Sequence, residues 1–301
     1  MRVTQSMLSS NFLRNVSNSY ERMGKYQEQL STGKKVTKPS DDPVVAMKGM
    51  NYRTELTEVQ QYQRNLGEVH TWMDNSDAAM DKMTKALQRT RELAVQASND
   101  SYEEGQRANI AKEVRQLKEH LIDLGNTKVN DKHIFNGTST TNPRFDKDGN
   151  LDTANANSAA VNIEVSDGVK IRVNTNPSNI FVDSESGQSM MEALENFATD
   201  LESGETGETG DQLDDHIENI DGFINQVVNE RASLGARMNR VDMIENRLNS
   251  QEITTTQVLS DNEDVDVEKV IMNLKSQESV HRAALSTGAR IIQPTLMDFL
   301  R

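Results

Sequence analysis

Histidines have the widest chemical range in this sequence, because an imidazole can bind a metal or move a proton near neutral pH. The chain has five: His70, His120, His133, His216 and His281. No two stand at the spacing of a zinc site, and no HExxH sequence occurs. We therefore predict that each histidine lies on the surface or in a helix seam, and that the chain has no metal ligands and needs no cofactor.

Other catalytic patterns are missing as well. The chain has no cysteine, so it has no thiol nucleophile and no disulfide. It also lacks the GxSxG, GxxxxGK[ST] and GxGxxG sequences. Gly204, Gly207 and Gly210 recur every three residues, but among Glu and Thr with no strand before them, which is typical of a linker. No catalytic site is predicted, and we do not expect an enzyme.

The tract DKDGNLD, residues 146–152, resembles a calcium-binding loop. With Gly149 at the sixth position of an EF-hand loop, Arg144 takes the first ligand position and Asn155 the twelfth. A cation in the first position and no bidentate Glu in the last fit calcium poorly. A polar turn between two strands is the favoured interpretation.

The composition narrows the class of protein. The formal net charge is −14, which argues against nucleic acid or an anionic membrane as a partner. Only 35% of residues are hydrophobic and 4% aromatic, which favours long helices with narrow buried stripes over a large globular core. There is no apolar run of signal-peptide or transmembrane type, so these features alone would predict a cytoplasmic protein.

Heptad spacing predicts long helices that would position any functional side chains. A first stripe of mostly apolar residues ends at a tract rich in helix breakers, and its members are Leu13, Val16, Tyr20, Met23, Gln27 and Leu30. Asp42 followed by Pro43 then predicts an N-cap and the first residue of a second helix. That helix, residues 43–98, would be about 80 Å long, so it must pack along other long helices. Its stripe contains Tyr52, Glu55, Val59, Tyr62, Leu66, Val69, Met73, Ser76, Met80, Met83, Leu87, Thr90, Ala94 and Ala97.

The remaining helices follow the same period. Ser101 and Glu104 form a capping box, and the helix after them should reach about Lys128 and pair antiparallel with the second helix. Another stripe occupies residues 213–248. An acidic start and a weaker stripe predict a last helix within residues 261–292, where the macrodipole favours the acidic residues.

The middle of the chain differs in character. Two alternating runs, VNIEV and VKIRV, flank Ser166, Asp167 and Gly168, which predicts a β-hairpin. A capping-box pattern at Ser189 predicts a short helix of about residues 190–202, and SGETGETGD after it predicts a flexible linker. The apolar residues expected on one face of the hairpin are Val161, Ile163, Val165, Val169, Ile171 and Val173.

The expected fold is therefore mainly α with a small β-rich insertion. Long N- and C-terminal arms form an antiparallel helical bundle or coiled-coil rod, and the β domain is inserted in the middle. The expected domains are terminal coiled-coil arms (1–42 and 264–301), an α-helical rod domain (43–129 and 184–263) and an outer β-rich domain (130–183).

Several motifs resemble the flagellin family. LSTGKKVTKPSDDPVVAMKGM, at residues 30–50, resembles its N-terminal signature, and RELAVQASND at 91–100 resembles the end of the helix that follows. LGARMNRVD at 234–242 resembles the C-terminal motif, and LSDNEDVDVEKV leads the last helix as in the family. The matches cover about 100 residues at each end of the chain, in the family order. The residues that carry the motifs include Ser40, Asp41, Asp42, Pro43, Gly235, Asn239 and Arg240.

Three details resemble the family members that join the flagellar hook to the filament. They are the proline-flanked PSDDP sequence at 39–43, the HIFNGT sequence at 133–138 and the terminus PTLMDFLR at 294–301. The resemblance implies an extracellular structural subunit, exported through the flagellar type III apparatus without a cleaved signal peptide. Its implied partners are the preceding hook-associated protein, flagellin, copies of itself in a helical ring and an export chaperone, with no nucleic acid and no membrane.

The resemblance also implies that the terminal arms are disordered in the monomer and pair as coiled coil on assembly. Alternatives remain open: a filament-forming flagellin, a cytoplasmic coiled-coil adaptor, or a flagellin with a protease insert, for which the central segment lacks metal ligands. The residues predicted to make assembly contacts are Leu13, Val16, Tyr20, Met23, Leu30, Val267, Ile271, Leu274 and Leu285.

Overall fold

The computed structural model describes residues 5–98, 104–152, 155–183, 187–203 and 209–291. It divides into two compact units. The terminal unit comprises residues 1–58 and 250–301, and the central unit comprises residues 59–249.

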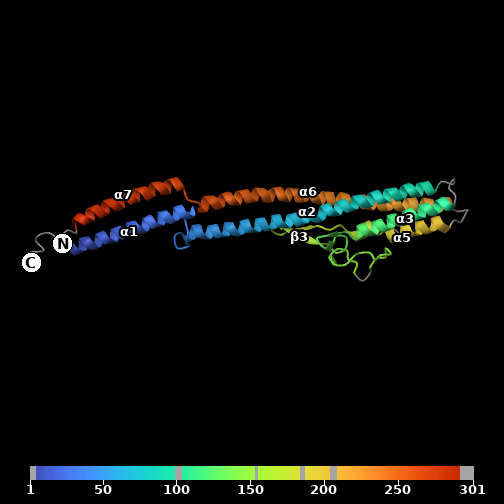
Figure 1. The fold of residues 1–301 in the computed structure, drawn as a ribbon, viewed down its shortest axis with the longest axis horizontal. Helices are drawn as coiled ribbons and strands as arrows, with labels where there is room; N and C mark the ends of the chain where they lie inside the picture. Colours follow the sequence, from blue (N-terminus) through green and yellow to red (C-terminus); the bar gives the residue numbers. More distant parts are fainter. Residues whose placement is uncertain (1–4, 99–103, 153–154, 184–186, 204–208, 292–301) are drawn as a thin grey trace, which may run out of the picture. The chain divides into compact units, whose positions relative to one another are not determined.

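Long helices dominate both units, and short strands occur only between α3 and α5 in the described chain, which confirms the predicted fold class (Figure 1). The second helix begins at the predicted residue and ends one residue before the predicted end. The long helices are α1 (Gln5–Thr32), α2 (Pro43–Ala97), α3 (Glu104–Gly125), α5 (Met190–Ser203), α6 (Thr209–Glu263) and α7 (Val267–Ile291).

In the central unit, α2 and α6 pack antiparallel along a buried seam. Arg91 pairs with Asp221 at 2.6 Å, and the Gln63 amide donates to the Asn249 side chain at 3.0 Å, so later residues of α2 meet earlier residues of α6. Every residue from Val59 onward in the predicted α2 stripe is buried or half-buried. The stripe prediction is confirmed for this helix.

Helices α3 and α5 lie side by side in the same unit (Figure 1). The Glu195 carboxylate bridges them by accepting from Lys118 Nζ at 2.9 Å and Arg115 Nε at 3.3 Å. Arg89 of α2 pairs with Glu113 of α3 at 2.8 Å, as expected for neighbouring helices.

Helix α3 ends at Gly125, before the predicted Lys128, and the prediction of its end was wrong. The chain leaves the helix because β1 (Lys128–Val129) pairs with β2 (Lys132–His133). A Cβ at residue 125 would lie 2.8 Å from the Phe145 ring, so the backbone approaches the insertion closely there. Ser101 of the predicted capping box lies outside the described residues.

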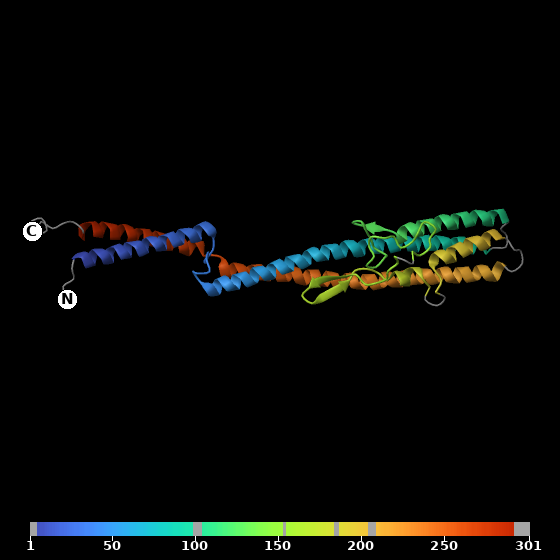
Figure 2. The ribbon, with the colours of Figure 1, turned by 90° about the horizontal axis from the view of Figure 1, so that it is seen from below.

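The predicted hairpin is present. β3 (Asn162–Ser166) and β4 (Val169–Arg172) form an antiparallel hairpin (Figure 2). Ile163 lies opposite Ile171, and Gly168 has a φ of +66° at the turn. The apolar residues expected on one face are all buried or packed against the core. A short helix, α4 (Pro177–Phe181), follows the hairpin.

The tract compared with a calcium-binding loop, residues 146–152, forms a turn. The Asp146 carboxylate accepts the Asn150 backbone N–H at 2.8 Å, and Gly149 has a φ of +86°. A single bridge between Phe145 and Leu151 closes the turn, so the strands expected on either side are reduced to one residue each.

The linker prediction was partly wrong. Residues 204–208 lie outside the described chain, but α6 already begins at Thr209, inside the tract predicted to be a linker. Helix α5 begins at Met190, directly after Ser189, and ends one residue beyond the predicted end.

Asp42 caps α2. Its carboxylate Oδ1 accepts the backbone N–H groups of Val44 at 3.0 Å and Val45 at 3.1 Å, and Pro43 is the first helical residue. This geometry satisfies donors that have no partner within the helix. The predicted N-cap is confirmed.

We expect Asp42→Ala to lower the free energy of unfolding by about 1 kcal/mol, because two helix donors lose their acceptor. Urea unfolding followed by circular dichroism measures the change. Ser40→Ala, at an exposed position of the same turn, is the control. Equal midpoints for the two variants would contradict the capping role.

Candidate assembly surface

Helices α1 and α7 form an antiparallel pair in the terminal unit (Figure 1). The Gln277 amide donates to Ser19 Oγ at 2.8 Å, and the Phe12 ring lies so close to Gly288 that a Cβ there would be 2.0 Å away. The inward residues recur in steps of three and four. On α1 they are Phe12, Val16, Ser19, Met23, Tyr26 and Leu30, and on α7 they are Val270, Leu274, Gln277, His281, Ala284 and Gly288.

This seam has few large apolar side chains. Ser19 is buried at 4% exposure and is hydrogen-bonded to a glutamine, and Gly288 has no side chain. Burial of polar and small groups stabilises a helix pair much less than burial of leucine does. The pair therefore has a weak intramolecular seam.

An apolar stripe lies beside the seam and is exposed. Leu13 and Tyr20 of α1 are 60% and 66% exposed, and Ile271 and Leu285 of α7 are 45% and 48% exposed. Each directly follows a seam residue in the sequence. Antiparallel helices are related by a two-fold axis perpendicular to both, so equivalent positions lie on the same side of the pair. The four side chains thus form one apolar stripe.

The sequence placed three of the six α1 seam positions one residue too far along the chain and the other three correctly. It put Leu13, Tyr20 and Gln27 in the stripe, whereas the structure turns Phe12, Ser19 and Tyr26 inward. Ser19 was missed because it is polar. Of the predicted assembly contacts, Val16, Met23, Leu30 and Leu274 are half-buried in the chain's own helix pair, and Leu13, Tyr20, Val267, Ile271 and Leu285 are exposed. Their role in assembly stays a prediction.

Where α1 ends and α7 begins, the two chain segments are braced together. Lys34 and Asp264 form an antiparallel bridge, and Val265 N–H donates to the Gly33 carbonyl at 2.9 Å. Gly33 has a φ of +70°, which favours glycine. Lys35 N–H donates to the Glu263 carbonyl at 2.7 Å.

The Glu263 carboxylate is the centre of this brace. It is only 9% exposed and binds Lys34 Nζ at 3.1 Å as well as the Arg53 guanidinium. Burial disfavours its charged form, but the hydrogen bonds from Arg53 and Lys34 outweigh burial and hold the pKa below its ordinary value. A Cβ at Gly49 would lie 2.3 Å from this carboxylate, so a larger residue there would force the Glu263 side chain to shift.

We expect Glu263→Gln to cost about 1–2 kcal/mol of unfolding free energy near neutral pH. A lowered pKa stabilises the fold above the ordinary value of 4.5, and that stability is lost as the pH falls through the lowered pKa. The difference from wild type should therefore shrink below about pH 4.5.

Urea unfolding at pH 7 and at pH 3.5 measures this difference. Glu58→Gln, at an exposed glutamate of the same unit, is the control and should change little at either pH. A difference that stays constant with pH would contradict the ionic role of Glu263.

The N-terminal motif residues lie between the end of α1 and the start of α2. Asp42 caps α2 at Pro43, as described above, and Ser40 is exposed. Asp41 accepts the Lys38 backbone N–H at 3.3 Å and pairs with Lys25 at 3.3 Å. The hydrogen bond from the Lys38 N–H lowers the pKa of the exposed Asp41 carboxyl below its ordinary value, and Lys25 adds to the effect against some desolvation.

The C-terminal motif residues, unlike Asp41 and Asp42, are not the ones that make the contacts in their part of the fold. Gly235 on α6 has open space where a Cβ would stand, and Asn239 and Arg240 are exposed. The residue that makes the contacts is Arg237, between them, which the sequence prediction missed. Arg237 binds backbone carbonyls that lie far away in the sequence, and no pattern near residue 237 indicates such partners.

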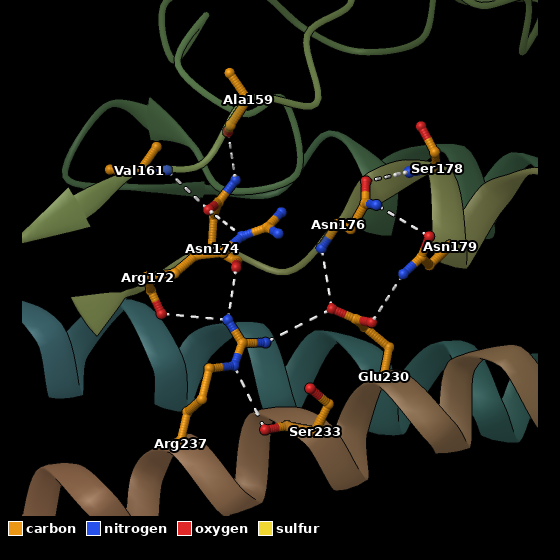
Figure 3. A network of polar contacts seen from close by, with 10 residues as sticks. All are labelled: Ala159, Val161, Arg172, Asn174, Asn176, Ser178, Asn179, Glu230, Ser233 and Arg237. Atoms are coloured by element: carbon orange, nitrogen blue, oxygen red, sulfur yellow. Dashed lines mark hydrogen bonds and ion pairs between the residues drawn. The ribbon is translucent and has the colours of Figure 1, made fainter. Parts of the chain in front are cut away.

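Figure 3 shows Arg237 holding the insertion to α6. Its guanidinium donates to the carbonyls of Arg172 at 3.2 Å and Asn174 at 2.9 Å, and pairs with Glu230 at 3.6 Å. Glu230 in turn accepts the Asn176 backbone N–H at 3.0 Å. Burial lowers the pKa of Arg237, and the Glu230 carboxylate opposes the shift.

We expect Arg237→Lys to destabilise the chain by about 1–3 kcal/mol, since an ammonium cannot reproduce the fork of donors that spans two carbonyls and a carboxylate. Hydrogen exchange should rise at residues 172–176, and urea unfolding gives the energy. Arg240→Lys, on the exposed side of α6, is the matched control. Equal stability of the two variants would show that the Arg237 contacts do not hold the insertion to α6.

Comparison with known proteins places these features in a family. Residues 3–140 match the bacterial flagellin N-terminal helical region, and residues 217–300 match the C-terminal helical region. The chain belongs to the flagellin family. The predicted family is thus confirmed, and it is a family of structural proteins of the bacterial flagellum.

Relatives of this flagellin-family chain include hook-associated proteins and flagellins. Flagellar hook-associated protein 3 of Escherichia coli is 25% identical over 94% of this chain and 95% of its own length. Flagellin of Listeria innocua is 24% identical over 95% of this chain and 94% of its own length.

Solved structures share the fold. A putative flagellar hook-associated protein from Vibrio parahaemolyticus has a TM-score of 0.68 at 20% identity and covers 74% of this chain and 100% of its own. The flagellar junction protein FlgL from Legionella pneumophila has a TM-score of 0.59 at 15% identity, covering 72% and 99%. Among the described helices of this flagellin-family chain, none combines the length and apolar character needed to cross a bilayer.

Proposed function

We propose that the chain is a structural subunit that joins the flagellar hook to the filament. The observation that carries the proposal is the match to flagellar hook-associated protein 3 over nearly the whole length of both chains. The fold shared with a flagellar junction protein supports it. The sequence features PSDDP and HIFNGT point the same way.

The apolar stripe on the terminal unit suggests how such a subunit assembles. Leu13, Tyr20, Ile271 and Leu285 would bury against neighbouring subunits, and head-to-tail contacts of this kind build an open helical array. The weak seam of α1 and α7 fits arms that order only on assembly. In this proposal residues 1–42 and 264–301 are the assembling arms, 43–129 and 184–263 the α domain, and 130–183 the outer β domain.

The partners follow from the proposed position. The hook-side neighbour would be the preceding hook-associated protein, and the filament-side neighbour flagellin. We further propose that the chain reaches this extracellular site by flagellar export with a chaperone, and that its role is structural with no enzymatic activity.

A filament-forming flagellin is the second candidate. The specific observation in its favour is the match to Listeria innocua flagellin, which covers both chains as fully as the match to the hook-associated protein does. The sequence identity of this chain to the flagellin, 24%, is nearly the same as its identity to the hook-associated protein, 25%.

Electron microscopy of a deletion strain and antibody labelling of wild-type flagella distinguish the candidates. A junction subunit predicts hooks without filaments, flagellin in the medium and label only at the distal end of the hook. Label along the whole filament would identify a flagellin. Normal flagella in the deletion strain, with the protein inside the cell, would overturn both and favour an adaptor.

A further inference from the structure

One group of side chains in the central unit has the composition of a metal site. His70 lies on α2, and Asp242 and Glu245 lie on α6. One potential ligand atom from each lies within 4.8 Å of the others, and His70 Nε2 is 3.1 Å from Glu245 Oε2. Within the part of the chain that the structure describes, no other such group of three is found.

The fold explains why these residues meet. Asp242 and Glu245 are three residues apart on a helix, so both carboxylates point from the same face. The antiparallel packing of α2 brings His70 to that face, although it is far away in the sequence. Motif searches along the sequence miss such a site, because its ligands come from two distant helices.

The donor set selects the class of ion. Zinc binds imidazole nitrogen and carboxylate oxygen at about 2.0–2.2 Å, so neighbouring ligand atoms lie about 3.0–3.5 Å apart. The His70–Glu245 distance of 3.1 Å already fits this spacing. Asp242 is exposed, so its side chain can rotate inward. Calcium needs six to eight oxygen ligands and fits the group poorly.

The site is accessible from solvent. The side chains of His70 and Glu245 are 28% and 47% exposed, which allows a hydrated ion to enter and a water to complete the coordination. Three protein ligands with an open position suit a late transition-metal ion.

We propose that His70, Asp242 and Glu245 bind a divalent transition-metal ion, with Zn²⁺ as the best fit. The ion would connect α2 to α6 and stabilise the central unit. This inference goes beyond the proposed function and is independent of it.

The test uses the full chain without a histidine tag, stripped with a chelator and titrated with Zn²⁺ in a calorimeter. We expect one equivalent to bind and the Tm to rise. His70→Asn should weaken binding at least about tenfold and abolish the rise in Tm. His120→Asn removes an exposed imidazole on α3 and should bind as wild type does.

Asp242→Asn provides a second variant, because this exposed residue should be dispensable for folding but not for zinc affinity. Replacement of zinc by Co²⁺ should give visible absorption bands that are lost in His70→Asn. Equal zinc binding by His70→Asn and wild type would overturn the proposal. So would an absence of binding to wild type, or an equal rise in Tm with Ca²⁺, which would leave His70–Glu245 as a simple hydrogen bond.

Discussion

A chain that carries Leu13→Asp together with Leu285→Asp is expected to fold and to fail in assembly. Both leucines are largely exposed on the apolar stripe of the terminal unit. Burying one leucine against a neighbour stabilises a contact by about 1.5–3 kcal/mol, and burying an unpaired carboxylate costs more than that. Because every subunit carries both changes, we expect the association constant between subunits to fall at least about a hundredfold.

The double variant would be expressed in the deletion strain, with motility in soft agar and electron microscopy as readouts. Asn18→Asp with Ser276→Asp is the matched control, because it adds the same charges on the exposed side away from the stripe. Circular dichroism of the purified chains checks the fold. Normal motility of the Leu13 and Leu285 variant would show that the stripe makes no essential contact.

Phe181→Ala is expected to lower the free energy of unfolding by about 3–5 kcal/mol. Phe181 is 1% exposed and contacts the rings of Phe135 and Phe145 edge-on, with centroid distances of 6.0 and 5.0 Å. The Arg144 guanidinium, buried at 2% exposure, lies 5.9 Å from the centre of the Phe181 ring. Removing the ring leaves a cavity beside a buried cation, whose pKa burial already lowers to about 10.

Urea unfolding of the full chain gives the stability of this variant. Leu151→Ala, which removes a side chain that is 37% exposed in the same insertion, is the control and should cost much less. Equal losses in the two variants would mean that the aromatic cluster is not the core of the insertion.

The helices could be predicted because their signals are local. Asp42 and Pro43 start α2, and the stripe that follows is inward-facing in the structure. The hairpin was also predicted, since alternating runs and a glycine with positive φ lie within a few residues of one another.

The candidate sites could be predicted only in part. Glu263, Arg237 and His70 each find partners that lie far away in the sequence, and neither composition nor spacing indicates which charged residues will meet. Three positions of the α1 seam were wrong by one residue, because the apolar Leu13 and Tyr20 were favoured over the polar Ser19, which hydrogen-bonds to Gln277.

The tip of the β-hairpin has a practical consequence. Asp167 and Gly168 are exposed, and nothing lies within 4 Å of the position that a Cβ would take at Gly168. The paired strands hold the turn from both sides, so extra residues would extend outward and leave the buried face of the sheet unchanged. A foreign peptide displayed there would be carried by every copy of the subunit, which makes the hairpin tip a natural place to present an antigen or a label.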